Sequence, residues 1–108
     1  MKDDAPMQAF SQGDLVRIGS GDQVFLVVSK NAFIKAADMF HVCPVIRGVK
    51  EGPLHIIVNG RDGTNGTAVT EEIRLIDAKA GNCEKLDSIP LQEMIEVSDM
   101  LQGVYEYD

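Results

Sequence analysis

Tryptophan is absent from this chain of 108 residues, and aromatic residues make up only 6% of it. Two cysteines, Cys43 and Cys83, are too few for a disulfide framework, so we expect both to be thiols that pack as small apolar groups. No apolar run approaches the roughly 20 residues of a membrane span, and the polar start of the chain has no signal-peptide core. These absences predict a cytoplasmic protein without membrane contact.

Basic residues are also few, because ten Lys and Arg stand against 17 Asp and Glu, a net charge of -7. Residues 1–54 hold six of each sign, so the excess of acid falls entirely in residues 55–108. An acidic protein binds polyanions poorly, because phosphate contacts dominate such affinity. A nucleic-acid site would therefore have to be local and built mainly from the first half.

The hydrophobic content of 44% is enough for a packed core. The length predicts a single domain over residues 1–108, in which we expect residues 1–9 to form a flexible N-terminal tail. The ten glycines lie among short apolar runs, which indicates many tight turns.

Residues 23–47 contain two dense apolar runs, residues 24–28 and 39–46, separated by a polar segment. Both runs are short and rich in β-branched residues, so they predict neighbouring strands. Pro44 interrupts the second run and predicts a sheet edge or a bulge there. The polar segment is ambiguous, and residues 31–37 are compatible with a helical turn or an irregular loop.

Further strands are expected over residues 15–18, 54–58, 67–70, 73–76 and 82–86. The Gly-rich residues 59–66 predict a long flexible loop. A closing helix is expected after an N-cap at Asp87 or Ser88, with Gly103 just beyond its end. Its apolar stripe (Leu91, Met94, Ile95 and Leu101) predicts a core-facing side, with a partner contact as the alternative. The fold class is thus mainly β with a C-terminal helix (α+β), in the form of a small barrel.

Five segments, in order over residues 10–102, resemble the MazF/PemK family of toxin–antitoxin endoribonucleases. They are Gly13-Asp14-Leu15-Val16, Phe25-Leu26-Val27-Val28-Ser29, Val42-Cys43-Pro44-Val45-Ile46, residues 69–77 and the final helix. The resemblance implies an SH3-like barrel of the MazF/PemK/CcdB kind and a homodimer. It also implies an mRNA interferase that cleaves single-stranded RNA without a metal or other cofactor, and an antitoxin protein as a candidate partner.

In this family the ribose 2′-hydroxyl attacks the adjacent phosphate, assisted mainly by an Arg before the second strand and a Thr at the end of the third. The resemblance places Gln23 at the Arg position and Ile46 at the Thr position. Gln23 is neutral and Ile46 has no polar atom, so neither can take over the expected role. Glu72 stands where the family has Gln.

Our candidate catalytic residues are therefore Gln23, by position, and Arg47, a guanidinium one residue beyond Ile46 that can bind phosphate. Strand alternation would point Arg47 to the other face unless Pro44 introduces a bulge. Arg17, Arg61 and Glu72 are the candidate nucleic-acid-binding residues. For each Arg, the alternative is an ordinary solvated surface residue.

Other polar groups carry weaker hypotheses. His41, Cys43, His55 and Cys83 lack the paired spacing of a zinc site, so we predict no metal. His41 as a general base and Glu71-Glu72 as paired carboxylates stay open beside plain surface roles.

Two alternatives to an active toxin remain: a catalytically silent family member that binds a protein partner, and an unrelated small barrel that acts as an interaction module.

Overall fold

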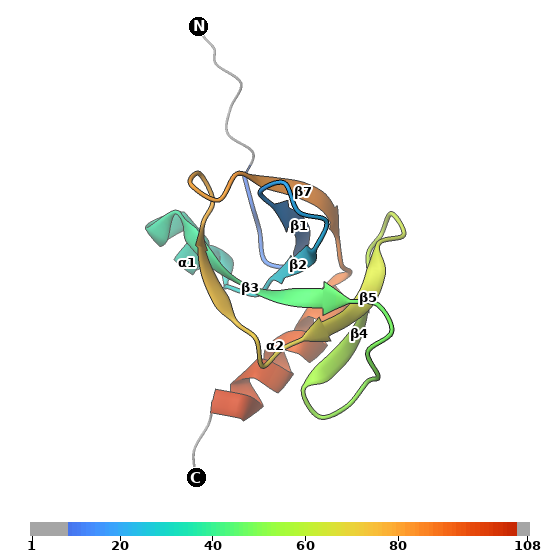
Figure 1. Cartoon of the computed structure of the whole chain (residues 1–108). Helices are drawn as coiled ribbons and strands as arrows, with labels where there is room; N and C mark the ends of the chain where they lie inside the picture. The colour runs from blue at the N-terminus through green and yellow to red at the C-terminus, as the bar shows by residue number, and fades with distance from the viewer. Residues whose placement is uncertain (1–8, 106–108) are drawn as a thin grey trace, which may run out of the picture.

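The computed structural model of the chain describes residues 9–105, with side chains described over residues 9–102. The tail predicted over residues 1–9 lies, except for Ala9, outside the described residues. The described part contains seven strands and two helices (Figure 1). These are β1 (Asp14–Ile18), β2 (Val24–Val27), α1 (Asn31–Ala37), β3 (Met39–Ile46), β4 (His55–Asn59), β5 (Asn65–Val69), β6 (Arg74–Asp77), β7 (Cys83–Ser88) and α2 (Leu91–Tyr105).

All pairings in the sheet are antiparallel, in the order β4-β5-β3-β2-β1-β7, and β6 pairs with β3 beside this path. One edge of β3 pairs with β2, while its other edge pairs first with β6 over residues 39–42 and then with β5 at Val45 and Ile46. Pro44 lies between these two ladders. The predicted interruption at Pro44 therefore occurs inside the sheet, where β3 changes partner, and not at an outer edge.

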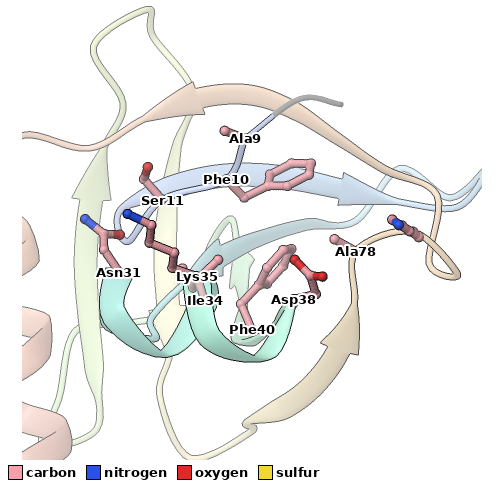
Figure 2. A pocket seen from close by; sticks show the side chains of 10 residues that line it. Ala9, Phe10, Ser11, Asn31, Ile34, Lys35, Asp38, Phe40 and Ala78 are labelled. Carbon is pink, nitrogen blue, oxygen red and sulfur yellow. The ribbon is translucent and has the colours of Figure 1, made fainter. Parts of the chain in front are cut away.

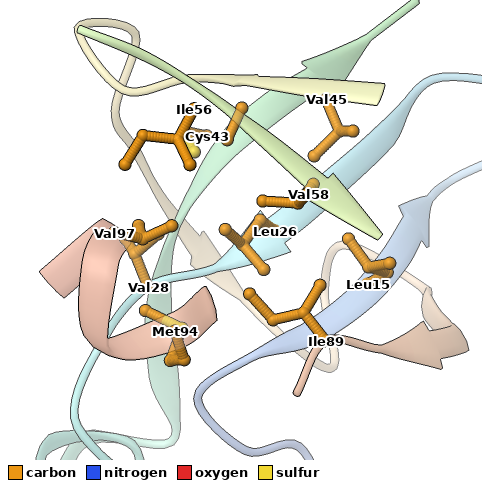
Figure 3. Close-up of a cluster of buried hydrophobic side chains, with 11 residues drawn as sticks. Leu15, Leu26, Val28, Cys43, Val45, Ile56, Val58, Ile89, Met94 and Val97 are labelled. Atoms are coloured by element: carbon orange, nitrogen blue, oxygen red, sulfur yellow. The ribbon is translucent and has the colours of Figure 1, made fainter. Parts of the chain in front are cut away.

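Both faces of β2 are buried. Leu26 belongs to an apolar cluster beneath α2, whereas Phe25 and Val27 belong to a second cluster on the opposite face. Figure 3 shows the first cluster, in which Met94 and Val97 of α2 pack toward Leu26 and Val28. Burial on both sides agrees with the central position of β2 between β1 and β3.

The helix α2 differs from its prediction in three respects. It begins at Leu91 and runs to Tyr105, so Gly103 lies within it. Leu91 and Ile95 were expected in the core but are 70% and 44% exposed, while Val97, outside the predicted stripe, is fully buried. A 3.6-residue period shows that a helix has an apolar side, but it does not show how much of that side the sheet covers. Leu91 and Ile95 lie on the part that stays exposed.

The sheet does not close by strand pairing, since β4 and β7 are its two ends in the described residues. The turn at residues 60–64 spans this gap, because the N–H of Arg61 donates to the carbonyl of Ser88 at 2.8 Å. Residues 59–66, predicted as a long flexible loop, form a short hairpin turn over residues 60–64, because β4 extends to Asn59 and β5 starts at Asn65.

Asp87 holds this turn in place and does not cap α2. Its carboxylate accepts hydrogen bonds from the backbone N–H groups of Asp62 at 3.0 Å, Thr64 at 3.0 Å and Ser88 at 2.7 Å. A Cβ on Gly60 would lie 2.2 Å from an Asp87 carboxylate oxygen, so the close approach requires glycine there.

Burial of the Asp87 carboxylate raises its pKa, but the N–H groups of Asp62, Ser88 and Thr64 lower it more, so the net pKa lies below its ordinary 3.8. A depressed pKa in the folded state means that the ionised form stabilises the fold. This contribution is present above the unfolded-state pKa and is lost as the pH falls through the folded-state pKa.

Within residues 9–105, no helix is long and apolar enough to span a membrane.

We predict that Asp87→Asn lowers the free energy of unfolding at pH 7 by about 1–3 kcal/mol, because a buried acceptor of several N–H groups is replaced by an amide. The difference from the wild type should shrink at an acidic pH below the lowered folded-state pKa of Asp87, where the wild-type carboxylate is also neutral. Urea unfolding at both pH values measures this. The exposed Asp22→Asn serves as the control, and an equal Asp87→Asn effect at both pH values would contradict the carboxylate's role.

Candidate functional site

The start of β2 and the end of β3 lie side by side. Val24 pairs with Val45, so Gln23, just before β2, lies beside the end of β3 at Ile46. The Gln23 amide group donates hydrogen bonds to the carbonyls of Val24 at 2.8 Å and Val45 at 2.9 Å. The two positions at which the family has its Arg and Thr are thus adjacent. Here the Gln23 side chain is hydrogen-bonded to backbone carbonyls, and Ile46 is apolar.

A groove of about 570 Å³ opens directly after the end of β3. Its lining comes from the turn after β3 and from the β4–β5 hairpin: Arg47, Gly48, Val49, Ile57, Asn59, Asn65, Gly66 and Thr67. Gly66 lets β5 approach β3, because a Cβ there would lie 2.8 Å from the Val45 side chain. The groove therefore lies where the sequence predicts a site, at the junction of Ile46 and Arg47.

Arg47 lines this groove together with Thr67, the residue that pairs with Ile46. Strand β3 ends at Ile46, and Gly48 adopts a φ of +84° in the turn that follows. Arg47 therefore lies beyond the strand, and the alternation of side chains along β3 does not decide its direction. The structure places Arg47 in the lining of the groove. Arg47 is exposed, and its guanidinium makes no hydrogen bond or ion pair with residues 9–102.

The chemical character of the groove follows from its lining. It contains one cation, two side-chain amides and one hydroxyl, and no carboxylate, histidine or cysteine is among the lining residues. Such a set can bind an anion and offer hydrogen bonds. It contains no side chain of the usual kind for proton transfer near neutral pH.

Thr67 is the hydroxyl nearest in register to the position of the missing threonine, since it pairs directly with Ile46. It is only 4% exposed, and its hydroxyl donates to the carbonyl of Val49 at 2.7 Å. This bond fixes the turn after β3 and so shapes the wall of the groove.

The other candidate residues lie apart from the groove. Arg17 forms an ion pair with Glu84 across β1 and β7. The Arg61 guanidinium donates to the Ser88 hydroxyl at 2.8 Å and to the Ile89 carbonyl at 3.0 Å, which fastens the turn that closes the sheet. Glu72 is exposed in the turn between β5 and β6. Arg17 thus has an anionic partner and Arg61 has two hydrogen-bond acceptors, whereas Arg47 is the cation that lines the groove.

Three groove residues with polar side chains are outside the predicted site set: Asn59, Asn65 and Thr67. The two asparagines fell in the predicted flexible loop, where Asn is explained by turn formation alone. Only the pairing of β4 with β5, which sets Asn59 opposite Asn65, brings them together.

Arg74 is a further cation near the ends of β2 and β3. Its guanidinium carbon lies 5.6 Å from the ring centre of Phe25, a cation–π distance. Phe25 is two residues from Gln23 on the same face of β2. The Arg74 side chain therefore packs over Phe25, which belongs to the second apolar cluster.

A second cavity, of about 480 Å³, lies at the other side of the molecule between α1, the start of β3 and the segment before β1 (Figure 2). Its floor is apolar, with the rings of Phe10 and Phe40 5.2 Å apart, and Lys35 and Asp38 lie at its rim. Its apolar floor is part of the second core cluster, which also contains Ile34. None of the candidate residues lines it.

The histidines and cysteines considered for metal binding are dispersed. Among the described residues, no group of three or more His, Cys, Asp or Glu is placed to hold a metal ion. Burial, aided by the charge of Glu71, raises the pKa of Cys43 to about 12, so this thiol is unreactive near neutral pH.

Each histidine has a local partner. The His41 ring nitrogen lies 3.1 Å from the hydroxyl of Ser29, and that hydroxyl also accepts the His41 N–H at 2.6 Å. His55 lies 3.0 Å from a carboxylate oxygen of Glu71. The hydrogen bond from His55 is the main cause of the lowered pKa of Glu71. Neither histidine lines the groove.

No protein-family model and no curated protein sequence matches the chain. Solved structures do. The chain is similar to a crystal structure of MazE-MazF from Deinococcus radiodurans with a TM-score of 0.79 and 22% identity, over 94% of this chain and 99% of that one. A structure of MazF alone from the same organism gives a TM-score of 0.74 with 22% identity, over 90% and 96%.

An endoribonuclease from a mycobacterial species, in complex with its cognate antitoxin, is similar with a TM-score of 0.76 and 16% identity, over 93% of this chain and all of that one. The likeness extends over nearly the full length in each case. The resemblance predicted from the five segments is thereby confirmed at the level of the fold: this chain has the fold of the MazF endoribonucleases.

Proposed function

We propose that this protein is a cytoplasmic, MazF-like component of a toxin–antitoxin pair that binds single-stranded RNA in the groove after β3. Cleavage of that RNA is slow, because the groove supplies charge stabilisation without a proton-transfer group. The observation that carries the proposal is the position of the groove. It opens at the end of β3, where the family resemblance predicts the site. It contains Arg47, whose guanidinium makes no hydrogen bond or ion pair with residues 9–102.

The proposed chemistry begins with attack of the ribose 2′-hydroxyl on the adjacent phosphorus, which yields a 2′,3′-cyclic phosphate and a free 5′-hydroxyl. Arg47 stabilises the added negative charge on the phosphate oxygens by hydrogen bonds from its planar guanidinium. General acid–base catalysis usually contributes about 10² to 10⁴-fold. No groove residue supplies it here, so we expect a rate lower by about that factor than in a site that has such a group.

A second candidate is a silent member that binds RNA or a protein without chemistry. One specific observation favours it: the Gln23 amide is already bonded to two carbonyls, and Ile46 offers no polar atom beside it. In this case Arg47 serves only for binding.

The partners are part of the same proposal. The similar structures include complexes of MazF with MazE and of an endoribonuclease with its antitoxin. We therefore propose an antitoxin protein as partner and a homodimer as the assembly. Leu91 and Ile95 support an assembly, because they expose apolar surface one helical turn apart on α2.

For RNA cleavage, we predict that the purified protein in EDTA cuts long single-stranded RNA slowly and leaves 5′-hydroxyl ends. Arg47→Ala should abolish this activity. The double variant Gln23→Arg/Ile46→Thr adds a cation and a hydroxyl beside the groove, and we expect the added charge stabilisation to raise the rate by roughly 10²-fold. End-labelled fragment analysis over time measures both, with the distant Lys79→Ala as the control.

If neither the wild type nor the double variant cuts RNA, the endoribonuclease proposal is wrong. If the wild type binds RNA through Arg47 without cutting it, the silent candidate holds. Cleavage that survives Arg47→Ala would reject the assigned role of Arg47.

For assembly, we predict a dimer in solution that the double variant Leu91→Glu/Ile95→Glu converts to a monomer, because two charges on an apolar contact are costly to bury. Light scattering after size-exclusion chromatography gives the mass. Gln92→Glu and Glu96→Gln on the same helix are the controls. A dimer that is unchanged in the Leu91/Ile95 variant would show that the contact lies elsewhere.

A further inference from the structure

Asn59 and Asn65 form a directly opposed pair at the end of the β4–β5 hairpin. The register pairs Asn59 with Asn65 and Ile57 with Thr67, so these four residues lie on one face of the hairpin. All four line the groove that contains Arg47. The Asn59 and Asn65 amides therefore line the groove on the hairpin side, and Arg47 lines it on the side of the turn after β3.

Both amides are available for a ligand. Asn59 and Asn65 are exposed, and neither side chain forms a hydrogen bond with residues 9–102. Their backbones, in contrast, are firmly placed. They pair with each other across the hairpin, and the N–H of Asn59 donates to a carboxylate oxygen of Glu93 on α2 at 2.6 Å. The two side-chain amides are thus carried by a backbone whose position is fixed by hydrogen bonds. Such preorganisation lowers the entropic cost of binding a ligand.

The groove's charge differs from that of the rest of the chain. The sequence has 17 acids against ten bases, yet the residues that line the groove include Arg47 and no acid. An anionic ligand is therefore tolerated here more readily than elsewhere on an acidic protein. A phosphate at Arg47 would leave the adjoining base facing the hairpin.

The hairpin offers a base hydrogen bonds and apolar surface, without a stacking ring. Ile57 is 47% exposed in the groove, and no aromatic residue lines it. Nonspecific single-strand binding combines a positively charged groove with aromatic side chains, on which any base can stack. This groove has a cation but no ring, so a bound base is contacted mainly at its edge by the two amides, which favours selectivity.

We propose that Asn59 and Asn65 form a base-reading subsite for one unpaired nucleotide of the RNA. An asparagine amide presents one donor and one acceptor, which match a donor–acceptor edge of an unpaired base, and two amides on a fixed hairpin distinguish the bases by where those edges lie. Arg47 binds the neighbouring phosphate and contributes affinity that is independent of sequence. This inference rests on the proposed function, because it takes single-stranded RNA as the ligand.

Binding is measured separately from cleavage with 2′-O-methyl RNA, which lacks the attacking hydroxyl. Fluorescence anisotropy with uridine-flanked heptamers, whose central bases are A, C, G or U, gives four dissociation constants for the full-length protein. We expect the tightest-binding heptamer to bind roughly tenfold more tightly than the weakest. Asn59→Ala or Asn65→Ala should remove most of that preference. Arg47→Ala should weaken all four heptamers similarly and reduce the salt dependence by about one phosphate contact.

Gln92→Ala, which removes an exposed amide on α2, is the matched control and should change nothing. Equal affinities for all four heptamers, or a preference that survives both Asn substitutions, would overturn the subsite. Selective binding without any cleavage would support the subsite while rejecting the nuclease. Cleavage whose sequence preference is unaffected by both Asn substitutions would reject the subsite while leaving the nuclease.

Discussion

The pairing of β2 with β3 is the interaction on which the rest of this structure depends. Its register places Leu26 opposite Cys43 and Val27 opposite Val42, so one ladder supplies both apolar clusters. A shift by one residue would exchange the faces of every side chain in β2. The same register brings Gln23, just before β2, to the end of β3, beside which the groove opens. One constraint thus sets the two apolar clusters and the placement of Gln23 beside Ile46.

Much of the fold is encoded locally, and the exceptions have clear physical causes. The two short, β-branched apolar runs in residues 23–47 were sufficient to predict two neighbouring strands, which are β2 and β3. Asp87 was misassigned, since a helix N-cap and an acceptor for a distant turn require the same residue type. Likewise, the Gly-rich residues 59–66 suggested flexibility, whereas the Asp87 carboxylate orders the turn. Such long-range bonds leave no periodic trace in a sequence.

The site was predictable in place but not in composition. Arg47 follows β3 directly, so its position could be inferred from one strand end. Asn59, Asn65 and Thr67 join it only through the pairing of β5 with both β3 and β4. The fold of the MazF endoribonucleases is therefore retained, while a bonded amide at Gln23 and an aliphatic side chain at Ile46 occupy the positions of the family's expected chemistry. In the function that we propose, the remaining polar groups of the groove serve recognition of RNA and not its fast cleavage.

Binding of RNA in the groove after β3 can be tested by amide chemical-shift mapping of the protein. Titration of the isotope-labelled protein with a 2′-O-methyl single-stranded RNA reports the contact surface residue by residue. The account predicts the largest shifts at Arg47, Gly48, Asn59, Asn65 and Gly66, which line the groove. Shifts confined to the cavity around Phe10, Ile34 and Phe40, or the absence of any shift, would contradict it.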